Sequence, residues 1–155
     1  MKYKILCTDG LAEIAVDKLK KMDLFEVVYE KSITHENLLK KIPAVHGLIV
    51  RSASSVSRDI IEAGKNLKII VRAGVGIDNI DASAASKKGI SVSNTPDGNT
   101  RSTAELTFGM ILALSRHIPQ AACLMSQGVW EKKKFSGTEI ANKTLGLIGV
   151  GRVGR

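Results

Sequence analysis

The sequence is poor in aromatic residues: its 155 positions include three Phe, two Tyr and one Trp. Proteins that bind single-stranded nucleic acid stack bases on several aromatic side chains. The residue spacings of helix-turn-helix and zinc-finger modules are absent as well. We therefore expect no nucleic-acid partner.

Cysteine is equally scarce. Cys7 and Cys123 are the two cysteines of the sequence, they lie far apart, and neither belongs to a Cys-x-x-Cys pair. Neither a disulfide framework nor a zinc site has support from this spacing. We expect no bound metal, and the cysteine content fits a reducing compartment.

Long hydrophobic runs are missing too. The N-terminus reaches Asp9 and Gly10 before an apolar core of signal-peptide length can form. No uninterrupted apolar run approaches the roughly 20 residues that cross a bilayer as a helix. We expect a cytoplasmic protein with no membrane partner.

The composition is otherwise that of a folded globular protein, with 44% hydrophobic and 25% charged residues. The formal net charge of +8 and the pI of about 9.6 allow three interpretations: a nucleic-acid partner, a small anionic substrate, or a piece of a longer protein without its acidic part. Composition alone does not decide among them. The lysines occur in short clusters that we expect to be mostly solvated faces.

Short β-rich runs alternate with amphipathic stretches through the first 92 residues. The expected strands are Tyr3–Cys7, Phe25–Tyr29, Gly47–Val50, Leu67–Val71 and Ile90–Val92; the expected helices are Leu11–Lys21, His35–Lys41, Ser57–Ala63 and Ala82–Lys88. Strands that alternate with helices predict an α/β fold with a doubly wound parallel sheet, flavodoxin-like or Rossmann-like.

A cluster of turn-forming residues at positions 94–99 predicts a domain boundary near residue 95. Ser102 and Glu105 then match a capping box, which predicts a helix start. This helix is apolar on nearly every side, so we expect it to be buried. Pro119 is expected to kink or restart it and Gly128 to end it. Residues 143–148 read as a strand that begins a second sheet.

The motif Gly149-Val-Gly151-Arg-Val-Gly154 follows that expected strand. In the dinucleotide fingerprint the first glycine permits a tight turn, the second admits a pyrophosphate, and the third allows close packing. The alternative is an ordinary glycine turn, because the helix and the acidic residue that complete the fingerprint are not in the sequence. We predict the start of a Rossmann cofactor domain here.

Two arginines follow expected strands. Arg51 comes after the strand that ends at Val50, and Arg72 after the strand that ends at Val71. Ligands of open α/β sheets bind at the carboxyl ends of the strands, so two guanidinium groups can converge there on a carboxylate or phosphate. Gly74 and Gly76 can present backbone N–H groups to the same anion, as a nest does; the alternative is a tight turn.

Other polar residues receive no functional assignment. His35, His46 and His117 have no carboxylate or nucleophile at suggestive spacing. Asp9 and the serines of residues 52–55 lie on edge loops, where they either line a pocket or cap helices.

In several segments the chain resembles the D-isomer-specific 2-hydroxyacid dehydrogenases. The order and spacing of these segments are more specific than any one of them: residues 48–52, 71–81, 94–99 with Ala104-Glu105, 128–135 and 147–154. The resemblance implies that residues 1–95 form a substrate-binding domain and that residues 96–155 are the N-terminal part of an NAD-binding domain.

The resemblance also implies roles for individual residues. Arg51 and Arg72 are implied as contacts of the substrate anion, Val75 as a cofactor-facing backbone position, and Arg152 with Val153 as pyrophosphate contacts. The family's catalytic arginine, glutamate and histidine correspond to positions beyond residue 155. We therefore expect no catalytic residue in this sequence and no activity from these residues alone.

The family resemblance further implies a homodimer. Its contacts are implied for the helix of residues 102–127 and for the arm around Trp130, with Lys132 and Lys133 near the active-site cleft of the neighbouring subunit. Trp130 packing on its own domain is the alternative.

Two functional hypotheses remain. The first is an enzyme, or part of one, that oxidises a phosphorylated D-2-hydroxy acid with NAD. The second is a binding or dimerisation module of the same fold without catalysis. The exact hydroxy acid and the choice between NAD and NADP are not determined by the residues present.

Overall fold

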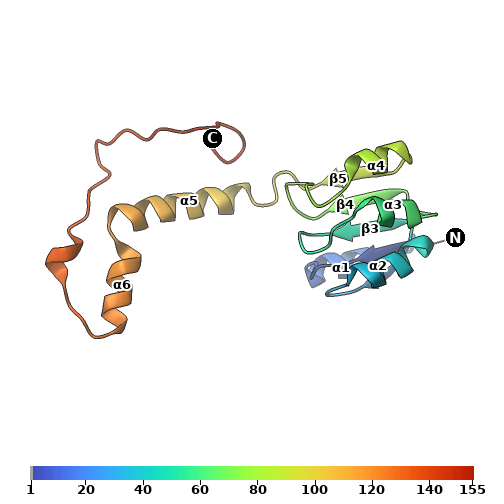
Figure 1. Cartoon of the computed structure of the whole chain (residues 1–155), viewed down its shortest axis with the longest axis horizontal. Helices are drawn as coiled ribbons and strands as arrows, with labels where there is room; N and C mark the ends of the chain where they lie inside the picture. Colours follow the sequence, from blue (N-terminus) through green and yellow to red (C-terminus); the bar gives the residue numbers. More distant parts are fainter. Residues whose placement is uncertain (1) are drawn as a thin grey trace. The chain divides into compact units, whose positions relative to one another are not determined.

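The computed structural model describes residues 2–155. The chain divides into two compact units, and the boundary between them lies between Gly98 and Asn99 (Figure 1). The expected boundary near residue 95 lies three residues earlier. Each unit is considered by itself below.

The first unit is a parallel sheet with connecting helices. Its elements are β1 (Tyr3–Cys7), α1 (Glu13–Lys20), β2 (Phe25–Tyr29), α2 (His35–Lys41), the 3₁₀ turn η1 (Ile42–Ala44), β3 (Gly47–Val50), α3 (Arg58–Ala63), β4 (Ile69–Arg72), α4 (Ala82–Lys87) and β5 (Ser91–Asn94). All five expected strands are present, with ends that differ by at most two residues. The strand order β2-β1-β3-β4-β5, parallel throughout, is the flavodoxin-like order, which confirms the fold class.

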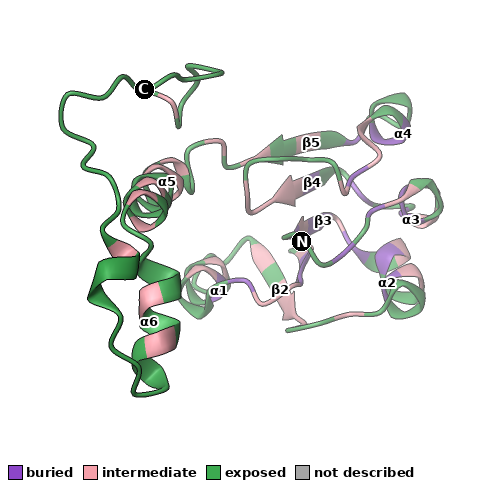
Figure 2. Ribbon diagram, turned by 60° about the vertical axis from the view of Figure 1, so that its left-hand side comes forward, coloured by how far each residue is buried: buried purple, intermediate pink, exposed green. Residues whose placement is uncertain are grey.

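Helices cover both faces of this sheet. Figure 2 shows α1 on one face and α2, α3 and α4 on the other. Alternate strand residues supply the two cores, because successive side chains of a strand point to opposite faces. Leu6, Leu48 and Ile70 belong to the larger core, while Ile5 and Cys7 belong to the smaller one beside α1.

The second unit begins with two helices, α5 (Thr100–Ser115) and α6 (Ile118–Ser126), and contains the 3₁₀ turn η2 (Lys132–Phe135). His117 has φ 54° between the helices, and Pro119 lies in the first turn of α6, so the expected restart at Pro119 is confirmed. Gly128 has φ 74°, and the N–H groups of Gly128 and Val129 donate to Met125 and Leu124. This Schellman arrangement ends the helix as expected.

Three expectations for the second unit were wrong. Ser102 is not the N-cap: α5 starts two residues earlier, and the Ser102 hydroxyl donates to the Asn99 carbonyl at 3.0 Å. The apolar residues of α5 are exposed, with Phe108 at 59% and Leu114 at 76%. Residues 143–148 form no strand, because none of the described strands pairs with them and a strand requires a hydrogen-bonded neighbour.

No helix within residues 2–155 has the length and apolar character needed to cross a membrane. Every buried residue in the described chain lies in the first unit, as the burial colours in Figure 2 show.

A hydrogen bond between side chains connects the first turns of α2 and α3. His35 Nε2 lies 2.7 Å from Asp59 Oδ2, and the Ser57 hydroxyl donates to Asp59 Oδ1 at 2.5 Å. These hydrogen bonds, from Ser57 first and His35 second, lower the pKa of Asp59 to about 2. The partner of His35 is 24 residues away, which is why sequence spacing did not reveal it.

We predict that Asp59→Asn lowers the unfolding midpoint at pH 5, and that the difference from the unmodified chain disappears in acid. The folded-state pKa is lowered from 3.8 to about 2. The ionised carboxylate therefore contributes its full stability above pH 3.8, and this contribution is lost as the pH falls towards 2. Thermal melts at several pH values measure the effect. Asp17→Asn, at an exposed helix position, is the control, and a difference that stays constant down to pH 2 would contradict the assignment.

Candidate functional site

The two arginines predicted to bind an anion lie at the carboxyl ends of neighbouring strands. β3 and β4 pair in parallel with Val50 opposite Arg72. Arg51 follows Val50 directly, so both arginines leave the carboxyl edge of the sheet. Neighbouring strands lie about 4.8 Å apart, and the backbones of the two arginines are therefore adjacent, as predicted.

The loop that carries Arg51 is held by Asp9, the second residue after β1. The Asp9 carboxylate accepts from the backbone N–H groups of Arg51 at 2.8 Å and Ser54 at 3.0 Å. It also accepts from the Ser54 hydroxyl at 2.5 Å. The exposed Arg51 guanidinium donates to the Gly10 carbonyl at 3.4 Å. The Arg51 backbone is thus held by Asp9, and its exposed side chain reaches the Gly10 carbonyl.

The charge state of Asp9 follows from these contacts. Burial alone would raise the pKa of this carboxyl, but the hydrogen bonds from Ser54 and from the Arg51 backbone outweigh burial and lower the pKa below 3.8. Asp9 therefore carries a negative charge at neutral pH.

The Arg72 side chain folds over its own loop and donates to the Gly76 carbonyl. A Cβ at Gly74 would lie 3.2 Å from Arg72 Cζ, and a Cβ at Gly76 would lie 3.1 Å from Arg72 Nη1. Both glycines therefore give the guanidinium the room in which it lies. Their predicted contribution to anion binding stays a prediction.

The backbone of this loop differs from the nest that the glycines suggested. None of residues 73–77 has a positive φ, and the Gly74 N–H already donates to the Arg72 carbonyl at 2.9 Å. The end of β5 secures the loop: Asn94 donates to the Val75 carbonyl, and the Thr95 N–H donates to the Gly74 carbonyl. Val75 itself is 39% exposed.

The two guanidinium groups point to different loops in this structure, that of Arg51 to Gly10 and that of Arg72 to Gly76. Each makes a contact with one carbonyl, which leaves most of its five N–H donors for another acceptor. The arrangement provides two positive groups at one sheet edge. A single shared anion site remains a prediction.

The glycine motif of the second unit forms a tight turn. Gly149 has φ 90°, and a Cβ at Gly154 would lie 2.5 Å from the Gly149 carbonyl oxygen. A Cβ at Gly151 would meet no atom within 4 Å. The first and third glycines therefore shape the turn, and the second leaves an open approach to the backbone. Arg152 and Val153 lie within the turn.

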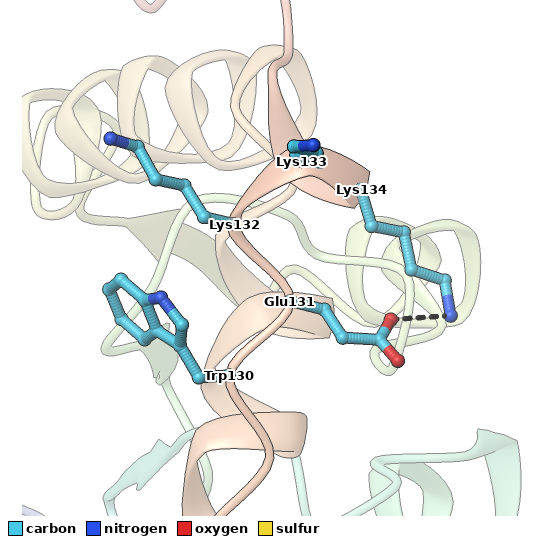
Figure 3. A pocket seen from close by; sticks show the side chains of 5 residues that line it. All are labelled: Trp130, Glu131, Lys132, Lys133 and Lys134. Atoms are coloured by element: carbon cyan, nitrogen blue, oxygen red, sulfur yellow. Dashed lines mark ion pairs between the residues drawn. The ribbon is translucent and has the colours of Figure 1, made fainter.

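The arm around Trp130 forms an open hollow of about 470 Å³ lined by consecutive residues. Trp130 and Lys132 point to one side of the arm, whereas Glu131 and Lys134 point to the other (Figure 3). Lys134 Nζ pairs with Glu131 Oε2 at 3.0 Å, and Trp130 is 73% exposed. Trp130 is thus not packed into the core of its own unit.

Comparison with known proteins assigns the family. The model described as D-isomer specific 2-hydroxyacid dehydrogenase, catalytic domain, matches residues 5–148. The chain belongs to this dehydrogenase family.

Two similar relatives carry different names. The chain is 49% identical to D-3-phosphoglycerate dehydrogenase of Sus scrofa over 98% of its own length and 28% of that protein. It is 48% identical to hydroxypyruvate reductase of Thermotoga maritima over 99% of its length and 50% of that protein. The chain thus spans between about a quarter and a half of these family members.

A solved structure of the family has the same fold. The NAD⁺-bound 3-phosphoglycerate dehydrogenase of Entamoeba histolytica aligns with a TM-score of 0.77 and 34% identity, over 99% of this chain and 48% of that chain.

Sequence patterns assigned no role to the residues that hold the Arg51 loop of this chain. Asp9, Ser54 and Asn79 are joined by hydrogen bonds across 25 to 45 residues, and such distances leave no local pattern. The signal that was available is the Asp9-Gly10 pair, which begins two residues after the first strand and is typical of a turn.

No group of three or more His, Cys, Asp or Glu residues within residues 2–155 is arranged to hold a metal ion. Burial raises the pKa of the Cys7 thiol to about 11, so this cysteine is protonated at neutral pH and is a core residue rather than a nucleophile.

We predict that Gly154→Ala opens the glycine turn while Gly151→Ala preserves it. The added methyl at position 154 would clash with the Gly149 carbonyl, whereas the methyl at 151 meets open space. Backbone amide chemical shifts of residues 149–155 measure the outcome. Gly146→Ala, also in open space, serves as the control. Equal shift changes for the 151 and 154 variants would contradict this account of the turn.

Proposed function

We propose that the chain forms the substrate-binding unit and the beginning of the cofactor unit of an NAD-dependent oxidoreductase. The proposed reaction is oxidation of D-3-phosphoglycerate to 3-phosphohydroxypyruvate, an entry to serine biosynthesis, in the cytoplasm. The observation that carries the proposal is the pair of arginines at the carboxyl edge of the sheet, Arg51 directly after β3 and Arg72 at the end of the adjacent β4. Such an edge is where open α/β sheets bind ligands.

The charge of the site suits the proposed substrate. D-3-phosphoglycerate carries a carboxylate and a phosphate, and guanidinium groups bind both with paired hydrogen bonds. Arg51 is exposed on its loop, and Arg72 lies over the glycine loop. We assign these two residues to the substrate anion, with Gly74 and Gly76 making the loop on which Arg72 rests.

The residues of the second unit fit NAD. The turn at Gly149 and the open backbone at Gly151 leave room for a pyrophosphate, and Arg152, Val153 and Gly154 complete the turn. In the first unit, Val75 stays the cofactor-facing backbone position that the family resemblance implies. When bound, NAD accepts the hydride from the substrate carbon. The contribution of this chain is to bind and orient; none of its residues is assigned a proton-transfer role.

Another D-2-hydroxy acid is the second candidate substrate. The relative named hydroxypyruvate reductase is 48% identical to the chain, which is close to the values for the relatives named D-3-phosphoglycerate dehydrogenase. Glycerate and hydroxypyruvate lack the phosphate, so affinity for phosphate is the property that separates the two candidates. A non-catalytic binding or dimerisation module of the same fold is the further alternative.

We predict that Arg51→Ala and Arg72→Ala each weaken binding of D-3-phosphoglycerate to the 155-residue chain. Loss of a hydrogen bond to a charged group costs about 1.5–3 kcal/mol, which corresponds to a roughly 10- to 100-fold weaker affinity. Titration followed by NMR measures it, with D-glycerate as the ligand without phosphate.

The matched control is Lys68→Ala, which removes the same charge just before β4 begins, at the opposite edge of the sheet. It is expected to leave the affinity unchanged. Unchanged affinity in both arginine variants would contradict the proposed site, and equal affinity for D-glycerate would favour the second substrate.

We further propose that the second unit associates with a second copy of the chain. Leu106, Phe108, Met110 and Leu114 of α5 are each more than half exposed. Exposed apolar residues in this number are typical of an interaction surface. Trp130 is the proposed anchor because large aromatic side chains are frequent at the centres of interfaces.

We predict that Trp130→Ala weakens self-association of the chain, by more than tenfold if Trp130 is a central anchor. Sedimentation equilibrium measures the association constant. Tyr3→Ala, an exposed aromatic of the first unit, is the control and should leave association unchanged. A monomeric unmodified chain, or an unchanged constant after Trp130→Ala, would contradict the proposal.

A further inference from the structure

The loop between Arg51 and Ser54 is held on both sides by two side chains that no assigned role uses. Its N–H groups at Arg51 and Ser54 donate to the Asp9 carboxylate. Its carbonyl groups at the same two residues accept from Asn79 Nδ2, at 2.8 and 2.7 Å. The backbone N–H groups of Arg51 and Ser54 are thus bonded to one carboxylate, and the carbonyl groups of the same residues to one amide.

Asp9 has a backbone conformation that favours glycine. Its φ of 62° lies in the left-handed region, which residues other than glycine enter at a cost and which Asp and Asn tolerate best. Gly10, with φ 63°, continues the turn. This turn points the carboxylate to the loop after β3, where three hydrogen bonds reach it, so the carboxylate contributes a contact that a glycine at this position would lack.

Asn79 connects the two arginine loops. It belongs to the segment that begins at Arg72 and passes through Gly74 and Gly76, yet its side chain donates to the Arg51 loop. The Asn79 backbone carbonyl accepts from the Val56 N–H at 2.8 Å, and the Asp81 N–H donates to the Val56 carbonyl. A displacement of either loop would therefore strain the other.

We infer that Asp9 and Asn79 are positioning residues that hold the Arg51 backbone at a fixed place relative to Arg72, so that both guanidinium groups are available to one substrate. The inference rests on the proposed function of the two arginines. Neither Asp9 nor Asn79 is a catalytic residue, and each acts on the substrate through Arg51.

The decisive variant is Asp9→Asn, which keeps the size and the left-handed preference of the residue but removes the charge and one acceptor oxygen. We expect it to weaken binding of D-3-phosphoglycerate to the 155-residue chain about tenfold. Asp59→Asn is the matched control: it also removes a hydrogen-bonded carboxylate of the first unit, but one without contact to the Arg51 loop, and it should leave affinity unchanged.

A double-mutant cycle separates positioning from general stability. If Asp9 acts through Arg51, Asp9→Asn has little further effect on affinity once Arg51 is Ala, because residues that share one contact are non-additive. Asn79→Leu is expected to behave in the same way. Melting curves show whether each variant is folded at the titration temperature. Ser54→Ala removes one of the three hydrogen bonds to the Asp9 carboxylate and is a milder variant should Asp9→Asn fail to fold.

The outcomes are distinguishable. Full affinity in a folded Asp9→Asn chain, or an equal loss of affinity with and without the Arg51 side chain, would overturn the positioning role while the arginine site stands. Unchanged affinity after Arg51→Ala and Arg72→Ala would instead contradict the proposed function itself.

Discussion

The position of β3 between β1 and β4 determines where both arginines begin. β3 starts at Gly47, where a Cβ would lie 2.7 Å from Ile5 Cδ1, so glycine leaves room for the Ile5 side chain. A slip of one residue would turn Leu48 and Val50 away from the larger core and towards the other face of the sheet, because side chains alternate along a strand. The register that buries these residues also places Val50 opposite Arg72. The arginine edge is therefore a consequence of core packing.

Sequence patterns predicted the first unit well because most of its strands are short runs rich in apolar residues between turn residues; β5, Ser91–Asn94, has one apolar residue and was placed one to two residues off. The parallel sheet then follows from the alternation of strands and helices, and the arginine edge follows from the sheet. What the patterns could not show is how the loops at that edge are held. The Asp9 carboxylate is bonded to Arg51 and Ser54 across more than 40 residues, and only the folded sheet brings β1 and β3 together.

The glycines beside Arg72 show a different reason for incomplete prediction. Gly74 and Gly76 suggested backbone N–H groups directed at an anion, whereas the structure shows them making room for a guanidinium. Both interpretations require the absence of a Cβ, so the sequence alone cannot separate them. Residues 73–77 have no positive φ, so the loop lacks the right- and left-handed alternation of one kind of nest, and anion binding by these glycines stays a prediction.

The second unit shows which predicted elements form without a packed neighbour. The α5 helix and the expected strand at residues 143–148 were both expected to be buried, and both are exposed, as Leu106 and Leu147 illustrate. α5 is nevertheless a regular helix of 16 residues, because a helix satisfies its backbone hydrogen bonds within itself. A strand satisfies them only with another strand, so residues 143–148 remain irregular. Apolar patterning predicts which face an element will bury, but it cannot supply the surface against which that face is buried.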